Sequence, residues 1–311
     1  MALCTLLSGC SSGSEPTSEN SKNPKKTSEA NARPPATTPT EATRILRAYL
    51  AAMSKPDTAA SKSVEASTAR TVHAVRLRLG EDVTPSLAPE FAIPRFSSYP
   101  RWFAAGAVRP GMTGDVAIFV QSRKDAPWRV HHVAYLSRPM PELSRDAEGY
   151  VTVADPGSVP VRQSKIFTDA LIDPSVIADR AKLAGSAEGD ADNPVIPVID
   201  GLRQNSKLFA ASSWQIQTSE VTQTGRSYAL KTKDGGAVVW YALQYNFKAV
   251  NVGRRFEITL ADEAVRMLGG RPAVSRLFAW SALYQSVAHA PATGDAKVLG
   301  VFPGWANMVG A

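Results

Sequence analysis

Cysteine is almost absent from this sequence, and long apolar runs are absent altogether. The 311 residues include two cysteines, Cys4 and Cys10, so no disulfide can link the residues that follow. No run of 18 apolar residues occurs, which excludes a protein with several membrane-spanning helices. With 44% hydrophobic and 20% charged residues, the composition is typical of a globular protein. The stability of that protein must therefore come from buried apolar surface.

Local signatures of common catalytic sites are also missing. The sequence has no Gly-x-Gly-x-x-Gly, P-loop, His-Glu-x-x-His or Cys-x-x-Cys motif, and its one Gly-x-Ser-x-Gly match, residues 9–13, lies in the small-residue stretch at the N-terminus. We therefore assign no catalytic residue, no cofactor and no metal from motifs. Asp190 and Asp192 resemble part of a calcium loop, but Pro194 stands where a third ligand belongs. We interpret this acidic segment as a solvated loop.

The net charge of +7 is not concentrated in one segment. Basic residues outnumber acidic ones by four to three in residues 11–40, by 15 to 12 in 41–157, and by 16 to 13 in 158–311. A nucleic-acid-binding surface requires a contiguous basic face. We therefore expect no nucleic-acid partner.

The N-terminus combines a short apolar stretch, two small residues and a cysteine. Leu7-Ser8-Gly9-Cys10 resembles the lipobox of bacterial lipoprotein signal peptides, which reads Leu-small-small-Cys. The resemblance implies cleavage between Gly9 and Cys10, and attachment of a diacylglycerol to the Cys10 thiol. No Lys or Arg precedes the apolar stretch, which is shorter than in a complete signal peptide. Residues 1–9 are therefore interpreted as a truncated signal.

Residues 11–40 contain no Val, Ile, Leu, Met or aromatic residue. Such a segment cannot bury enough apolar surface to offset the entropy lost on ordering. We predict a lipidated cysteine and a disordered linker over residues 10–40. An anchor, a linker and a globular body together indicate a protein held to the cell membrane by its N-terminal lipid, on the extracytoplasmic face.

The body begins with helical patterns and continues with strand patterns. Thr38 and Glu41 form a capping box before an apolar helical stripe, and a second helix is predicted over residues 61–79. Aromatic and Val-rich runs separated by turn residues follow. They predict antiparallel strands at residues 96–108, 115–123 and 128–136. Helices before strands indicate α+β packing, not alternating βαβ units.

A break around residues 155–160 is followed by the same order of elements. Helices are predicted at residues 161–172, 175–184 and 198–210. Strands are predicted at residues 214–217, 226–232, 237–247, 256–260, 277–287 and 298–302. The sequence thus predicts two tandem α+β domains, residues 41–157 and 158–311. Each would have N-terminal helices packed on a bent antiparallel sheet.

This order resembles the nuclear-transport-factor-two-like fold, in which N-terminal helices pack into the concavity of a strongly bent sheet. With the lipobox-like residues and the linker, the whole chain resembles actinobacterial lipoproteins of unknown function. The resemblance implies a location and an architecture for about residues 41–305. It implies no chemistry.

Four residues are candidates for a polar site in the cone of such a fold. His131 and His132 are adjacent, and on a strand their side chains would point to opposite faces, so binding one metal would require a bulge. Some proteins of this fold use an Asp/His pair for proton transfer. His73, Asp115 and one of His131 or His132 form the set that this sequence offers for that role.

Six tryptophans could serve either as core residues or as a ligand platform. We interpret most of them as core, and Trp305 as the best exception: Trp102, Trp128, Trp214, Trp240, Trp280 and Trp305. The leading hypothesis is a binding or scaffold module of the cell envelope, whose partner is an envelope protein or a small ligand. The alternative is a cavity enzyme, such as a hydrolase or isomerase, that uses a histidine and an acidic residue.

Overall fold

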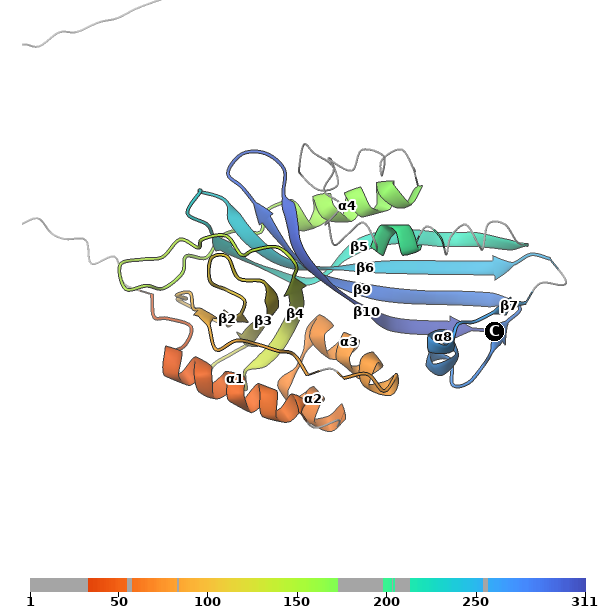
Figure 1. Cartoon of the computed structure of the whole chain (residues 1–311), viewed down its shortest axis with the longest axis horizontal. Helices are drawn as coiled ribbons and strands as arrows, with labels where there is room; N and C mark the ends of the chain where they lie inside the picture. The colour runs from red at the N-terminus through yellow and green to blue at the C-terminus, as the bar shows by residue number, and fades with distance from the viewer. Residues whose placement is uncertain are drawn as a thin grey trace, which may run out of the picture. The chain divides into compact units, whose positions relative to one another are not determined.

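Figure 1 shows a computed structural model that describes residues 33–54, 58–82, 84–172, 198–202, 204, 213–253 and 257–311. Several predicted features lie outside the described residues: the truncated signal peptide, Cys10, most of the linker, the helix 175–184 and the acidic loop. Within the described ranges, no helix combines the length and the apolar character needed to cross a bilayer.

The main element is an eight-stranded antiparallel sheet with the strand order β1-β2-β3-β4-β10-β9-β6-β5. Its strands are β1 (Phe91–Ala92), β2 (Arg101–Gly106), β3 (Gly114–Gln121), β4 (Arg129–Leu136), β5 (Trp214–Lys231), β6 (Ala237–Asn251), β9 (Leu277–Ala290) and β10 (Lys297–Gly310). A separate pair joins β7 (Ile258–Thr259) to β8 (Ala273–Val274). The described helices are α1 (Pro39–Met53), α2 (Thr58–Val64), α3 (Ser67–Arg78), α4 (Val159–Ile172) and α8 (Asp262–Met267). The predicted α+β class is confirmed.

The predicted capping box of the first helix is confirmed in part, because Thr38 caps the helix but the Glu41 carboxylate accepts from Arg44 and not from the Thr38 amide. The Glu41 amide donates to Thr38 Oγ1 over 3.2 Å, and Pro39 occupies the first helical position, where its missing N–H costs nothing. The predicted apolar stripe of α1 is buried along its length: Ala42, Ile45, Leu46, Tyr49 and Met53.

The single helix predicted over residues 61–79 is wrong, because the structure has two helices there. The break lies at Glu65 and Ala66, where the Ala66 amide donates to the Val130 carbonyl of β4 over 2.8 Å. Ser67 then begins α3 with a φ of 54°. A bond to the sheet therefore replaces an intrahelical bond at this point, and periodicity alone cannot reveal such a replacement.

Several predicted strands differ in extent from the structure, and the clearest differences are in β2, β5 and β10. The first predicted strand, 96–108, shortens to β2, whereas the strands predicted at 214–217 and 226–232 are parts of one long strand, β5. The strand predicted at 298–302 extends as β10 to Gly310. β10 pairs with β9 from Lys297↔His289 to Gly310↔Phe278, so cross-strand bonds extend it through a weakly patterned sequence.

Helices precede strands on both sides of residue 157, as α1–α3 before β1–β4 and α4 before β5–β10 (Figure 1). The strands of both halves form one sheet, and Arg33–Ala311 is one compact unit. The division into domains 41–157 and 158–311 stays a prediction. The structure adds that strands from both halves form the same eight-stranded sheet.

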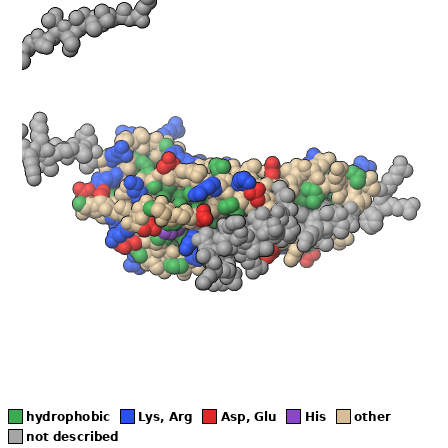
Figure 2. Space-filling model, turned by 90° about the horizontal axis from the view of Figure 1, so that it is seen from above, with side chains coloured by type: hydrophobic (Ala, Val, Ile, Leu, Met, Phe, Trp, Pro, Cys, Tyr) green, Lys and Arg blue, Asp and Glu red, His purple; other side chains and the backbone are tan. Residues whose placement is uncertain are grey.

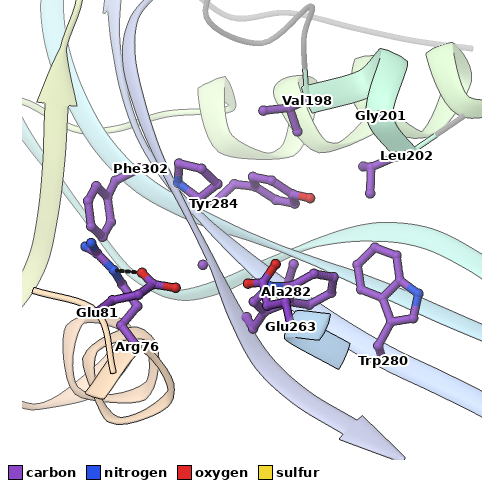
Figure 3. A pocket seen from close by; sticks show the side chains of 13 residues that line it. Arg76, Glu81, Val198, Gly201, Leu202, Glu263, Trp280, Ala282, Tyr284 and Phe302 are labelled. Carbon is purple, nitrogen blue, oxygen red and sulfur yellow. Dashed lines mark hydrogen bonds and ion pairs between the residues drawn. The ribbon is translucent and has the colours of Figure 1, made fainter. Parts of the chain in front are cut away.

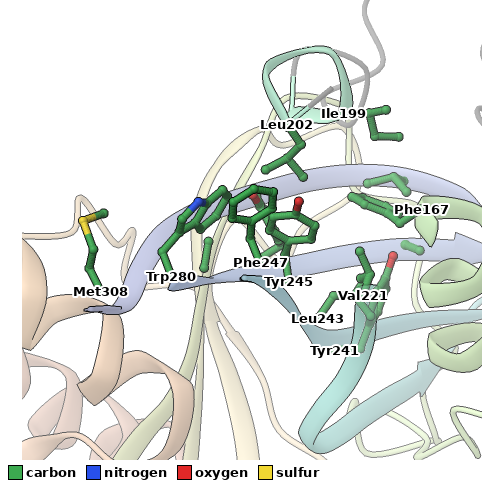
Figure 4. Close-up of a cluster of buried hydrophobic side chains, with 14 of the residues drawn as sticks. Phe167, Ile199, Leu202, Val221, Tyr241, Leu243, Tyr245, Phe247, Trp280 and Met308 are labelled. Carbon is green, nitrogen blue, oxygen red and sulfur yellow. The ribbon is translucent and has the colours of Figure 1, made fainter. Parts of the chain in front are cut away.

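The sheet folds back on itself around an internal core. One face of β2–β4 packs against α1 and α3, through residues such as Phe103 and Phe119. The other face packs against β5 and β6, and Trp102 contacts Tyr228 edge-on with a ring-centroid distance of 5.3 Å. A third cluster lies between α4 and the long strands, where Phe167 joins the aromatic residues of β6 (Figure 4).

The two halves of the sheet meet at one close approach. β4 pairs with β10 only at Leu136↔Gly300, and the Ser137 and Arg138 amides both donate to the Leu299 carbonyl. A Cβ atom at position 300 would lie 2.0 Å from the Tyr135 carbonyl oxygen, so only glycine fits. No other strand among the described residues pairs with this edge of β10.

We predict that Gly300→Ala destabilises the protein by about 1–3 kcal/mol, because the new methyl group would push β4 and β10 apart. Thermal unfolding followed by circular dichroism measures the effect. Gly201→Ala is the matched control, since a Cβ there meets no atom within 4 Å. Equal melting temperatures for Gly300→Ala and the unsubstituted protein would contradict the prediction.

Candidate ligand-binding pocket

His73 lies in a buried polar cluster built by the first three helices. The exposed fractions of the His73 and Glu65 side chains are 1% and 0%, and His73 Nδ1 is in direct contact with Glu65 Oε1. The Tyr49 hydroxyl donates to the same carboxylate over 3.0 Å and the Ser61 hydroxyl over 2.7 Å. Burial, reinforced by the charge of Glu65, raises the pKa of Tyr49, so this hydroxyl stays protonated.

The predicted partner of His73, Asp115, lies elsewhere. The Asp115 carboxylate accepts a 2.6 Å hydrogen bond from the Ser86 amide, which fixes the segment before β1. The acidic residue that contacts His73 is instead Glu65, which the sequence analysis did not select. A Glu eight residues before a His is not a recognised motif. Glu65 and His73 come together because the helix predicted over residues 61–79 is broken between them.

His131 and His132 have different surroundings on β4. A bulge between the register pairs Ile118↔His132 and Phe119↔Val130 places His131 outside the regular pairing. His131 Nδ1 lies 3.2 Å from the Tyr228 hydroxyl, and burial lowers the His131 pKa, with Arg129 and Arg226 adding to the effect. His132 is fully buried, and burial lowers its pKa to about 3.

The structure therefore does not bring the four predicted residues together. β4 has the bulge that two adjacent histidines would need to bind one metal ion. In the part of the chain that the structure describes, however, no group of three His, Cys, Asp or Glu side chains is suited to hold a metal. His132, like Glu65, is enclosed by protein.

A cavity of about 510 Å³ lies instead between α3, α8 and the two strands β9 and β10 (Figure 3). Figure 3 shows Val198 and Leu202 on one side of it, Glu263 on the opposite side, and Arg76 with Glu81 at one end. Four aromatic side chains dominate the lining: Trp280, Tyr284, Phe302 and Trp305. The volume falls in the range of small-molecule sites, about 300–1,000 Å³.

Strand geometry accounts for the placement of the lining. Trp280, Ala282 and Tyr284 alternate along β9 and therefore share one face of the sheet. Ala282 pairs with Trp305, and Tyr284 pairs with Pro303, so these β10 residues continue the same face. Beyond Gly300, β10 has no strand on its outer edge among the described residues, and the cavity lies at that open edge.

Two tryptophans form a corner of the cavity. The rings of Trp280 and Trp305 meet with a centroid distance of 4.9 Å and an interplanar angle of 73°. Tyr245 and Phe247 pack behind Trp280 at 4.8 Å and 5.8 Å (Figure 4). The aromatic wall is thus held in place by the core and requires little ordering when a ligand binds.

Helix α3 packs against the end of the cavity that Phe302 and Gly304 form. The His73 ring packs edge-on against Phe302, with a centroid distance of 6.4 Å. A Cβ atom at Gly304 would lie 2.3 Å from Val72 Cγ1, so glycine lets α3 approach β10 this closely. The buried Glu65–His73 cluster therefore supports the wall of the cavity from behind and does not line it.

The charged groups of the lining are few. Arg76 Nε donates to Glu81 Oε2 over 2.7 Å, and the Arg76 guanidinium lies 5.1 Å from the centre of the Phe302 ring. The indole N–H of Trp305 donates to Glu263 Oε1. Burial raises the pKa of Tyr284, which keeps its hydroxyl neutral and able to donate a hydrogen bond.

The sequence analysis identified one member of this site, Trp305, and missed the others. Trp280, Ala282 and Tyr284 lie on a strand that is apolar on both faces, so the pattern gave no sign that one face borders a cavity. Glu263 belongs to a six-residue helix, α8, that was not predicted.

Comparisons with known proteins agree with the extent of this folded body. The profile of a family described as “Domain of unknown function (DUF8094)” matches residues 33–303. A protein of Streptomyces avermitilis named “Uncharacterized lipoprotein” is 23% identical over 287 residues, which cover 85% of this chain and 82% of that protein. No solved structure matches. The nuclear-transport-factor-two-like resemblance stays a prediction, since neither match names that fold.

The burial of His132 predicts a specific dependence of stability on pH. The pKa of His132 rises on unfolding from about 3 to the ordinary 6.5, so only the unfolded state takes up a proton between these values. Stability is therefore lost as the pH falls below 6.5, by about 2 kcal/mol at pH 5. Urea unfolding of His132→Gln should show a flatter profile between pH 7 and pH 5. His131→Gln, at a half-buried site, should change the profile less, and parallel profiles for His132→Gln and the unsubstituted protein would refute the assignment.

Proposed function

The chain belongs to the family described as “Domain of unknown function (DUF8094)”, and we propose that it is a lipoprotein of the cell envelope that binds a small molecule in the cavity beside β9 and β10. Its lipid-carrying Cys10 would hold the folded body at the extracytoplasmic face of the membrane. The cavity, with its four aromatic walls, is the observation that carries the binding function.

Two observations support the anchor. Leu7-Ser8-Gly9-Cys10 has the lipobox pattern, and the Streptomyces relative is named a lipoprotein. The family match begins at residue 33, inside the linker predicted over residues 10–40. The predicted linker is too long, because residues 33–40 belong to the folded body, where the Ala36 amide donates to the Pro94 carbonyl. Residues 11–32 carry no apolar residue larger than Ala or Pro. A flexible chain of the 22 residues 11–32 reaches roughly 25 Å on average, so the body could work at a distance from the lipid surface.

Binding explains the cavity better than catalysis does. A catalytic histidine must reach its substrate, whereas none of the four predicted residues, His73, Asp115, His131 and His132, lines the cavity. The Glu65–His73 contact has the chemistry of an acid–base pair, but both side chains are enclosed by the helices around them. The charges on the face shown in Figure 2 are interspersed, and the absence of a nucleic-acid partner stays a prediction.

We predict that Cys10→Ala moves the protein from the membrane pellet to the soluble fraction, because the acceptor of the lipid is lost. The protein is expressed from its own gene in its native cell and fractionated by ultracentrifugation. Cys4→Ala is the matched control and should stay in the pellet. Recovery of Cys10→Ala in the pellet at the unsubstituted level would disprove the anchor.

The binding function is tested with the neutral probe N-phenyl-1-naphthylamine, whose fluorescence increases in apolar sites. The full-length protein should bind the probe, and Ala282→Phe should weaken binding at least about tenfold by filling the cavity. Val309→Phe is the control, because Val309 is 46% exposed and outside the lining. Circular dichroism verifies that both variants fold. Absence of probe binding, or equal affinities for the two variants, would disprove the pocket function.

A further inference from the structure

We infer that the cavity binds an organic cation, in which an ammonium group is carried on an apolar body. This inference rests on the proposed binding function and specifies its ligand class. It follows from the charges in the lining, from the groups to which these charges are already bound, and from the orientation of the aromatic walls.

Among the described residues, the lining holds one basic and two acidic side chains: Arg76, Glu81 and Glu263. The positive charge is already compensated, since Arg76 is ion-paired with Glu81, and Arg76 Nη2 also donates to the Asp82 carbonyl over 2.8 Å. Glu263 is different. Its bond in the described structure comes from the neutral indole of Trp305, and no described Lys, Arg or His forms an ion pair with it.

Within the part of the chain that the structure describes, one carboxylate of the cavity thus lacks a positive partner. A half-buried carboxylate beside aromatic rings interacts with a cation more strongly than one in bulk water, because the surroundings screen its charge less. A cationic ligand would supply the missing charge. An anionic ligand would meet this carboxylate and an arginine that is already neutralised.

The aromatic walls favour the same class of ligand. Ring faces attract cations within about 6 Å, with tryptophan the strongest, and quaternary ammonium groups are commonly bound between such faces. Trp280 and Trp305 meet at 73°, so two indoles can contact one group from different directions. Phe302 already has a guanidinium 5.1 Å from its centre, which shows that this wall accommodates a positive charge.

A neutral sugar fits the lining less well. Sugars stack on tryptophan, but they also need several directed hydrogen bonds, and the polar groups here are mostly bonded to one another. Of the described side chains in the lining, Tyr284 and the second oxygen of Glu263 remain for a ligand. The lining therefore offers one charge and one hydroxyl within an apolar enclosure, which matches an ammonium group on an apolar body.

The test compares two molecules of nearly equal shape, choline and its uncharged analogue 3,3-dimethylbutan-1-ol. Each displaces N-phenyl-1-naphthylamine from the full-length protein, and we expect choline to do so at a concentration about tenfold lower or less. Added NaCl should reduce the advantage of choline, because salt screens the charge of a half-exposed carboxylate.

The decisive variant is Glu263→Gln, which removes the charge and keeps an oxygen for the Trp305 indole. It should abolish the advantage of choline and leave the affinity for the alcohol unchanged. Asp262→Asn is the matched control, since this exposed acidic neighbour in α8 does not line the cavity and should have no effect.

Each outcome decides one question. If the probe binds but choline and the alcohol displace it equally, or if Asp262→Asn acts like Glu263→Gln, the cation inference is wrong and the pocket function stands. If glucose or benzoate displaces the probe better than choline does, the ligand class is a sugar or an anion. If the probe does not bind at all, the proposed function itself is wrong.

Discussion

The contact of two main chains at Gly300 is the constraint on which the rest of the structure depends. β4 and β10 touch there so closely that a side chain at this position would force the two strands apart. This contact joins the strands of the two halves into one sheet. Because β10 then continues to Gly310 without a strand on its outer edge among the described residues, the same contact leaves an open strand edge beside the helices. The candidate pocket lies at that edge.

The buried polar cluster has a structural role that complements this contact. Glu65 accepts hydrogen bonds from α1 and α2 and contacts His73 of α3, so one carboxylate ties three helices together. A buried carboxylate needs several hydrogen-bond partners, because one without them would destabilise the folded state by several kcal/mol. The cluster also positions α3, which supports Phe302 and reaches the pocket through Arg76. A histidine that looks catalytic in the sequence therefore supports the pocket from behind.

The proposed function has two parts, a location at the membrane surface and a preference for one class of ligand. A lipid on Cys10 would confine the protein to the membrane surface, and the apolar-poor linker would let the folded body move over tens of ångströms. The pocket would then sample molecules close to that surface. Its rigid aromatic walls and Glu263, a carboxylate with no cationic partner among the described residues, would select by charge and shape.

The sequence by itself determined the elements that depend on neighbouring residues. Thr38, Pro39 and Glu41 specify the start of α1, and the alternating runs before and after residue 157 specify most of the strands, because caps and side-chain periodicity are local properties. Tertiary structure alone decided what depends on distant residues. The Val130 carbonyl ends α2, β9 extends β10 to its last residues, and strand pairing aligns Trp305 with Ala282. Trp305 could be singled out as unusual, whereas Glu263 and Glu65 could not. The role of a carboxylate depends on which charges surround it, and packing between segments far apart in the chain brings those charges together or keeps them apart.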